Sequence, residues 1–228
     1  NCITMLTKDE EKLIKSLHRK KGRKETGFCL LEGQKLIDVA GDAVERVFHP
    51  NDSERYDDLV TTETPQPIAA IAKIPEWTLN DVKAKDRIVV LDGVQDPGNV
   101  GAILRLCLAF KAGLVLIESA DPTSPKVIRS SAGAMFQTPW ASIPREGAED
   151  VIASLGAYVL RLEKRDGSTD LREVAGKKGE NVILIAGSEG NGIQLDYEAM
   201  SVHIGHDETL ESLNVANSIA IALHQFSG

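Results

Sequence analysis

The chain has 228 residues, of which 42% are hydrophobic and 26% charged, a composition typical of one large or two small globular domains. Its net charge of -8 excludes a protein that binds nucleic acid through an overall basic surface, so any RNA contact must be local. No apolar run reaches the roughly 18 to 20 residues that a membrane span requires. We therefore expect a cytoplasmic protein without a membrane partner.

The first third of the chain alternates helical and extended patterns. Thr7 and Glu10 have the spacing of a capping box, and apolar residues at helical intervals follow them. After this first helix, the pattern predicts a strand at 28–31, a helix at 34–40, a strand at 44–48, and helices at 53–59 and 67–73. Residues 74–77 are typical of an edge strand or a linker. A polar connector near 80–86 then predicts two domains, 1–82 and 86–228.

Five cations follow the first helix within seven residues: Arg19, Lys20, Lys21, Arg23 and Lys24. A charge run of this kind is ordinarily a solvated face. The alternative is a patch that contacts phosphate groups. The run by itself leaves both interpretations open.

Residues 87–91 (RIVVL) have the apolar, β-branched character of a strand buried on both faces. Asp96 can then cap a helix with Pro97 at its first position, and Gly113 follows its end. On this helix Asn99 lies near the N-terminal rim, whereas Arg105 projects from the body. A polar rim at the carboxyl end of a strand is where α/β proteins bind ligands, although an ordinary βα unit with a solvated arginine would have the same pattern.

The remaining pattern predicts strands at 114–117, 157–162, 181–186 and 202–204, alternating with helices at 126–131, 148–155 and 214–226. This alternation predicts an α/β fold with a mostly parallel sheet covered on both faces. Gly133 between two alanines indicates a close backbone approach. The cysteines Cys2, Cys29 and Cys107 match no metal-ligand spacing, so no metal is expected. The surroundings of the last two predict core positions rather than reactive thiols.

A glycine-rich loop, residues 187–192 (GSEGNG), follows the most apolar strand. It has neither the dinucleotide fingerprint nor the lysine of a phosphate loop. Glu189 inside it disfavours a phosphate ligand and suits a cationic group or a partner's arginine. Just before the last helix, Ser212 can act as an N-cap, and Asn214 needs hydrogen-bond partners if it is buried.

Taken in order, residues 96–101 (DPGNVG) with Arg105, residues 187–192 and residues 212–215 (SLNV) resemble the SpoU/TrmH family of RNA ribose 2'-O-methyltransferases, in the SPOUT superfamily. Residues 130–134 (SSAGA) are similar to a further signature of that family. The resemblance covers residues 87–226. More loosely, residues 23–33 are similar to a small α/β substrate-binding domain that itself resembles a ribosomal protein.

The resemblance implies an S-adenosylmethionine-dependent enzyme whose C-terminal domain contains a deep trefoil knot. It implies a homodimer with the active site at the subunit interface, where Arg105 serves the partner's cofactor. By the same resemblance, the cofactor lies on backbone groups of Gly187, Ile204 and Leu213. The active-site positions are those of five polar residues: Asn99, Arg105, Glu189, Ser212 and Asn214.

One departure stands at residues 204–206 (IGH), where the family usually has Ile-Pro-Met. The fine shape of the pocket there is therefore open. His206 is either a solvent-facing loop residue or a catalytic base.

The resemblance also implies that Arg105 accepts the hydroxyl proton. Because a guanidinium has a pKa above about 12, we favour a different hypothesis. Arg105 would bind a neighbouring phosphate and stabilise developing alkoxide, with Asn99 and Glu189 orienting it and with Ser212 and Asn214 placing the ribose.

The accessory N-terminal domain favours ribosomal RNA as substrate, with transfer RNA as the main rival, and residues 19–24 become the expected RNA contact. Two alternatives of other classes are a non-catalytic RNA-binding or ribosome-assembly factor of the same fold and a nucleotide-binding oxidoreductase. The intact polar positions disfavour the first, and the missing fingerprint disfavours the second.

Overall fold

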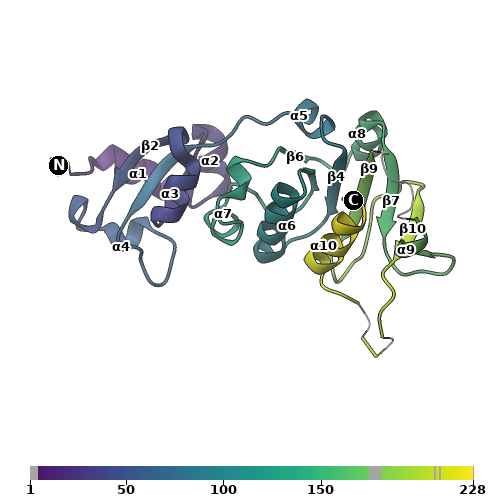
Figure 1. Cartoon of the computed structure of the whole chain (residues 1–228). Coiled ribbons are helices and arrows are strands. Elements are labelled where there is room, and N and C mark those ends of the chain that lie inside the picture. The colour runs from purple at the N-terminus through teal and green to yellow at the C-terminus, as the bar shows by residue number, and fades with distance from the viewer. Residues whose placement is uncertain (1–4, 175–180, 208, 211, 228) are drawn as a thin grey trace.

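The computed structural model describes residues 5–174, 181–207, 209–210 and 212–227. The molecule is elongated, with a smaller unit at the N-terminal end and a larger one that contains the C-terminus (Figure 1). The smaller unit contains a three-stranded antiparallel sheet in the order β1-β3-β2, and the larger unit a seven-stranded sheet in the order β6-β5-β4-β9-β7-β10-β8.

In the N-terminal unit, the helices and strands predicted up to residue 48 are present, together with one further helix at residues 20–26. Its elements are α1 (Lys8–Leu17), α2 (Lys20–Thr26), β1 (Phe28–Glu32), α3 (Gln34–Ala40), β2 (Val44–Phe48), α4 (Tyr56–Leu59) and β3 (Ala69–Lys73). The capping box at Thr7 is present, since its hydroxyl accepts from Glu10 N and the Glu10 carboxylate accepts from Thr7 N. The basic run, expected to trail the first helix, forms the separate helix α2.

The helix expected at 67–73 is wrong, because Ala69–Lys73 is the central strand β3. Alanine favours helices, which explains the expectation. In the sheet, however, β3 pairs with a strand on each side, and its alanines at 69, 70 and 72 are fully buried. Small side chains allow α-helices to lie close to both faces, and this tertiary packing outweighs local propensity. Residues 74–77 form a linker rather than an edge strand.

The C-terminal sheet is parallel at every pairing recorded among the described residues. Its strands are β4 (Arg87–Asp92), β5 (Gly113–Ile117), β6 (Trp140–Ile143), β7 (Tyr158–Leu162), β8 (Thr169–Asp170), β9 (Val182–Gly187) and β10 (Met200–His203). The predicted parallel α/β fold is therefore confirmed. Two strands were not predicted, β6 and β8. Both lie at the ends of the sheet, where a strand can be short and partly exposed and so lacks a buried pattern.

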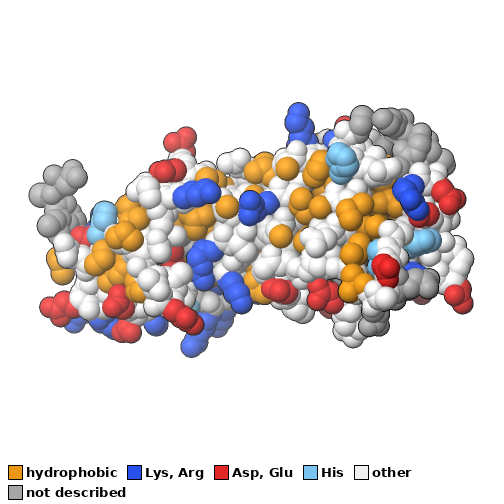
Figure 2. Space-filling view, turned by 60° about the horizontal axis from the view of Figure 1, so that its bottom comes forward, with side chains coloured by type: hydrophobic (Ala, Val, Ile, Leu, Met, Phe, Trp, Pro, Cys, Tyr) orange, Lys and Arg blue, Asp and Glu red, His pale blue; other side chains and the backbone are white. Residues whose placement is uncertain are grey.

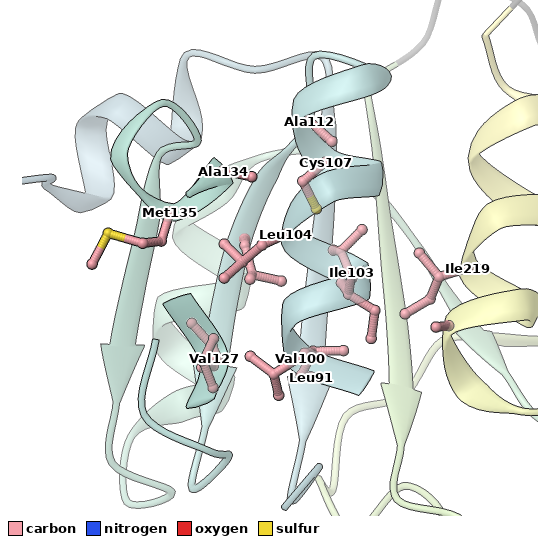
Figure 3. Close-up of a cluster of buried hydrophobic side chains, with 14 of the residues drawn as sticks. Leu91, Val100, Ile103, Leu104, Cys107, Ala112, Val127, Ala134, Met135 and Ile219 are labelled. Carbon is pink, nitrogen blue, oxygen red and sulfur yellow. The ribbon is translucent and has the colours of Figure 1, made fainter. Parts of the chain in front are cut away.

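Alternate residues of these strands point to opposite faces and form two cores. On one face lie α6 (Pro97–Ala109), α7 (Pro125–Ser130) and α10 (Val215–Gln225). Figure 3 shows Leu91, Ile103 and Ile219 meeting between the sheet, α6 and α10. The other face is covered by α5 (Leu79–Lys83) and α8 (Ala148–Leu155). The short helix α9 (Leu171–Val174) follows β8. No described helix has the length and apolar character needed to cross a membrane.

The predicted division at residues 82–86 remains a proposal. Val82 of α5 is fully buried in the core that also contains Ile88 and Val115. Helix α5 therefore belongs structurally with the C-terminal unit, although it precedes the predicted boundary.

Among the described residues, two ion pairs join the units. Arg23 of α2 donates to Asp121 Oδ2 at 2.6 Å, and Arg129 of α7 donates to Glu32 Oε1 at 2.9 Å. In addition, Gly133 lies so close to α3 that a Cβ there would be 2.7 Å from a methyl group of Val39. The close approach expected at this glycine is confirmed, and it fixes the N-terminal unit against the C-terminal one.

Candidate active site

Three polar side chains meet at the carboxyl ends of the neighbouring strands β4 and β9. Asn214 Nδ2 donates to Asn99 Oδ1 and to Glu189 Oε1, both at 2.9 Å, and Asn99 Nδ2 is 3.5 Å from the same Glu189 oxygen. Asn99 lies in the first turn of α6, Glu189 in the loop after β9, and Asn214 at the start of α10. We call these three residues the polar triad. All three were predicted from the sequence.

The last helix is capped by Asn214 and not by Ser212. Asn214 Oδ1 accepts from Ala216 N at 3.0 Å, which leaves the amide nitrogen for the polar triad. The capping role expected for Ser212 is wrong because the helix begins three residues later, at Val215. Ser212 is exposed instead.

The glycine-rich loop is a tight turn in which the chain passes close to itself. Ser188 and Gly192 form an isolated bridge, and Gly192 adopts a positive φ of 62°. A Cβ on Gly187 would lie 2.1 Å from the carbonyl group of Gly192. Glycine is therefore required at 187 by the turn itself.

Asp92, the last residue of β4, anchors the segment that follows this turn, and it was not predicted from the sequence. Its buried carboxylate accepts from Gln194 N at 2.5 Å, from Leu195 N at 2.7 Å and from Arg145 Nη2 at 2.7 Å. The available signal was an acidic residue directly after the apolar run 87–91, a position where a buried carboxylate needs partners.

Two adjoining cavities, of about 450 and 130 Å³, lie beside the polar triad. Gly187 and Glu189 line the larger cavity, Ile204 lines the smaller, and Leu213 and Ser212 line both. The structure thus brings together the three predicted cofactor positions and two of the predicted polar ones.

Glu163 and Lys164, which follow β7, also line both cavities and were not predicted. Burial raises the pKa of Glu163, but hydrogen bonds from Arg161 and Ser201 outweigh it, so the pKa lies below its usual value. The carboxylate is therefore ionised, but it is paired with Arg161 at 2.8 Å and with Arg165 at 3.4 Å. Among the described residues that line the larger cavity, Glu189 is the carboxylate for which no cationic partner is recorded. This charge suits a ligand with a cationic group.

Arg105 lies apart from the polar triad. Six residues along a helix rotate a side chain by about 600°, which places Arg105 well away from the face of Asn99. It is exposed and lines a separate hollow of about 260 Å³, together with Leu108 and Gln137. Within the described part of one chain, Arg105 does not contribute to the site.

His206 lines the smaller cavity, half-buried, with Nδ1 2.7 Å from Ile204 O and Nε2 3.2 Å from Leu210 O. These contacts tie the ring to its own loop. They give it no contact with the polar triad among the hydrogen bonds of the described residues.

The basic run is exposed at four of its five positions, Arg19, Lys20, Lys21 and Lys24. Figure 2 shows lysine and arginine side chains gathered along the lower edge of the N-terminal half in that view. The expectation that Arg23 contacts RNA is wrong: only 3% of this residue is exposed, and its guanidinium donates to Asp121, to Leu17 O and to Thr123 Oγ1. A buried, fully bonded arginine is a structural residue.

The buried thiols agree with the sequence analysis. Burial raises the pKa of Cys29 to about 12 and raises that of Cys107 further, so neither is a reactive thiolate. Cys2 lies outside the described residues. In the described ranges, no group of three His, Cys, Asp or Glu residues is arranged to hold a metal ion.

A parallel α/β sheet with a polar triad and cavities at the carboxyl ends of its strands defines a ligand-binding α/β domain, here joined to a small accessory unit. The chain belongs to the SpoU rRNA methylase family, whose model matches residues 86–224. The family inferred from the three motifs is confirmed.

Similar proteins agree with this membership. The 23S rRNA (guanosine(2553)-2'-O)-methyltransferase of Bacillus subtilis is 28% identical over 94% of either chain. The 23S rRNA (adenosine(1067)-2'-O)-methyltransferase of Streptomyces azureus is 34% identical over 76% of this chain and 67% of its own. The structure of an rRNA methyltransferase from Sinorhizobium meliloti with bound S-adenosylmethionine (AdoMet) superimposes with a TM-score of 0.84 at 28% identity, covering 97% of this chain and 95% of the other. The protein is an RNA methyltransferase that uses S-adenosylmethionine, as the resemblance implied.

Proposed function

We propose that this chain methylates ribose 2'-hydroxyl groups of ribosomal RNA. The observation that carries the proposal is the polar triad beside a cavity lined by Gly187 and Leu213, in a chain of the SpoU rRNA methylase family. The relatives that act on 23S rRNA support the choice of substrate. A cytoplasmic location follows from that substrate.

The residues around the cavities fit the cofactor. Their volume, about 450 Å³ in the larger, lies within the usual range of roughly 300 to 1,000 Å³ for small-molecule sites. Leu162 and Leu213 offer apolar walls, while the carboxylate of Glu189 complements the positive charge of a sulfonium or an ammonium group. When bound there, S-adenosylmethionine would supply a methyl group already activated for displacement.

The chain's own groups then have to place the ribose and assist the loss of its proton. Capping fixes the amide of Asn214, so its nitrogen points to Asn99 and Glu189 and holds the polar triad rigid. Ser212 offers a hydroxyl at the cavity to a ribose. Arg105 binds the neighbouring phosphate through bidentate hydrogen bonds from its guanidinium and stabilises the developing alkoxide.

Arg105 can do so only if it comes from a second subunit. It lies on another side of α6 from Asn99, beside Leu108, which is 38% exposed. The adjacent helix α10 exposes Ile221 to 42%. We therefore propose a two-fold homodimer that buries these surfaces of α6 and α10 and brings Arg105 of one subunit to the other's site.

The trefoil knot is proposed on the resemblance together with the path of the C-terminal segment. Helix α10 packs on α6 and β9, next to the loop that Asp92 anchors. A final helix in this position is consistent with a chain end passed through a loop.

Calorimetric titration with S-adenosylhomocysteine, in parallel with NADH, tests the cofactor site. Saturable binding is expected for S-adenosylhomocysteine and not for NADH. Methyl transfer from labelled S-adenosylmethionine to ribosomal RNA, to transfer RNA and to the matching 2'-deoxy oligonucleotide then tests the substrate. Transfer to tRNA alone, or to the deoxy oligonucleotide, would overturn the proposal.

A further inference from the structure

Helix α2 divides the basic run between two grooves. Arg19 and Lys21 line an outer groove of about 560 Å³ against α1. Lys20 and Lys24, one helical turn apart, line a groove of about 570 Å³ between the two units, which we call the interdomain groove. Its opposite wall is formed by Trp140 and Ser142 of the edge strand β6.

The charges in the interdomain groove favour a polyanion. Among the described residues, no ion pair or hydrogen bond is recorded for the side chains of Lys20 and Lys24, whereas Lys21 in the outer groove is 3.8 Å from Glu25. The acidic wall residue Asp121 is neutralised by Arg23. Lys20 and Lys24 therefore outnumber the one lining carboxylate for which no ion pair is recorded among the described residues, the exposed Glu76, and the groove keeps an excess of positive charge.

Aromatic rings complete the groove. Trp140 and Phe28, both half-buried, line it from opposite units, and Trp140 Nε1 is held by Met135 O at 3.1 Å. A fixed ring with lysines nearby is the arrangement that binds unpaired nucleotides, because bases stack on aromatic side chains while cations hold the phosphates. A duplex offers its bases only at the groove edges, so it cannot stack in this way.

We propose that the interdomain groove binds one or two unpaired nucleotides of the RNA substrate, with phosphates on Lys20 and Lys24 and a base against Trp140. This inference rests on the proposed RNA substrate, and it assigns a single-stranded segment to the groove between the units. Its volume of about 570 Å³ is that of a small-molecule site, too small for a helix of RNA.

The test uses the fluorescence of Trp140. The chain has two tryptophans, so Trp77→Phe leaves Trp140 as the reporter in the full-length protein. Titration with a tetrauridylate should quench its emission, while a short RNA duplex of equal charge should not. The double variant Lys20→Gln/Lys24→Gln should weaken tetrauridylate binding about tenfold and lower the slope of log affinity against log salt by about 1.4. The matched control is Arg19→Gln/Lys21→Gln, with the same change of charge at the N-cap and in the first turn of α2. Its tetrauridylate affinity should stay within about twofold of the parent.

Unchanged Trp140 emission while anisotropy of a labelled tetrauridylate shows binding would overturn the proposal. So would equal weakening by the two double variants, or emission that responds to an added polypeptide and not to RNA, which would make the groove a protein site. S-adenosylhomocysteine titration of the same samples separates the two proposals. Normal cofactor binding without a Trp140 response refutes the interdomain groove alone, whereas lost cofactor binding in the parent refutes the proposed function.

Discussion

Replacing Asp92 by asparagine should destabilise the protein by about 3 kcal/mol. Its carboxylate is fully buried and accepts from two backbone N–H groups and from Arg145. Asparagine keeps the shape, but its NH₂ group must face one of these donors. Breaking a buried ion pair costs roughly 3 to 5 kcal/mol, and the lower end applies because the Arg145 side chain is 33% exposed and keeps Glu118 as a second partner.

For a chain of this size, about 3 kcal/mol corresponds to a fall in Tm of roughly 6 to 12 °C, measurable by circular dichroism. The affinity for S-adenosylhomocysteine should fall as well, since Asp92 holds the segment after the glycine-rich loop. Glu118→Gln is the matched control. It removes the same charge from the other side of Arg145, but that carboxylate is 57% exposed, so less than about 1 kcal/mol is expected. Equal effects of the two variants would refute the anchoring role.

Three further changes test the site and the domain interface. Gly187→Ala should cost more than about 2 kcal/mol and abolish cofactor binding, because its Cβ would meet backbone at 2.1 Å; Gly190→Ala, which has open space, should leave both unchanged. Arg105→Lys should lower the rate of methyl transfer at least about tenfold while the affinity for S-adenosylhomocysteine is retained. A turnover close to that of the parent would contradict bidentate phosphate binding by Arg105. The pKa of Asp121 is raised by burial but lowered further by hydrogen bonds from Arg23 and Thr123, so its net shift is downward. The stability it contributes is therefore fully present above about pH 4 and lost as pH falls through the lower folded value. In acid titrations of unfolding, Asp121→Asn should lack that part of the loss, and identical acid profiles would argue against the pair.

The sequence predicted those elements whose conformation is determined by residues within or next to the element itself. Thr7 with Glu10, and Asp96 by itself, satisfy backbone N–H groups within one turn, and Pro97 has no N–H that needs a partner. These residues therefore fix where their helices begin. The strands β4, β5 and β9, which are buried along almost their whole length, were equally predictable from the sequence, because burial on both faces imposes a continuous apolar run. Such features do not depend on the rest of the chain.

The elements that were missed depend on partners far along the chain. The alanines of β3 become strand residues only because β1 and β2 flank them. Arg23 belongs to a run of otherwise solvated cations. Its partner Asp121 lies 98 residues further along the chain, and the ion pair buries Arg23 in the interface between the two units. Asp92 likewise owes its role to backbone groups about 100 residues further on. No local pattern encodes such distances.

Asn214→Asp would separate the capping role of this residue from its role in the polar triad. An aspartate can still cap α10, so stability should change by less than about 1 kcal/mol. Its second oxygen, however, would replace the donor that now lies 2.9 Å from Glu189 Oε1. Two carboxylates that close cannot both be ionised, so one must take up a proton with a raised pKa. Below that pKa the protonated oxygen donates as the amide did. Methyl transfer by the variant, relative to the parent protein, should therefore be low at about pH 8 and rise toward about pH 5, whereas a constant ratio across this range would show that the triad's hydrogen bond is not needed for the reaction.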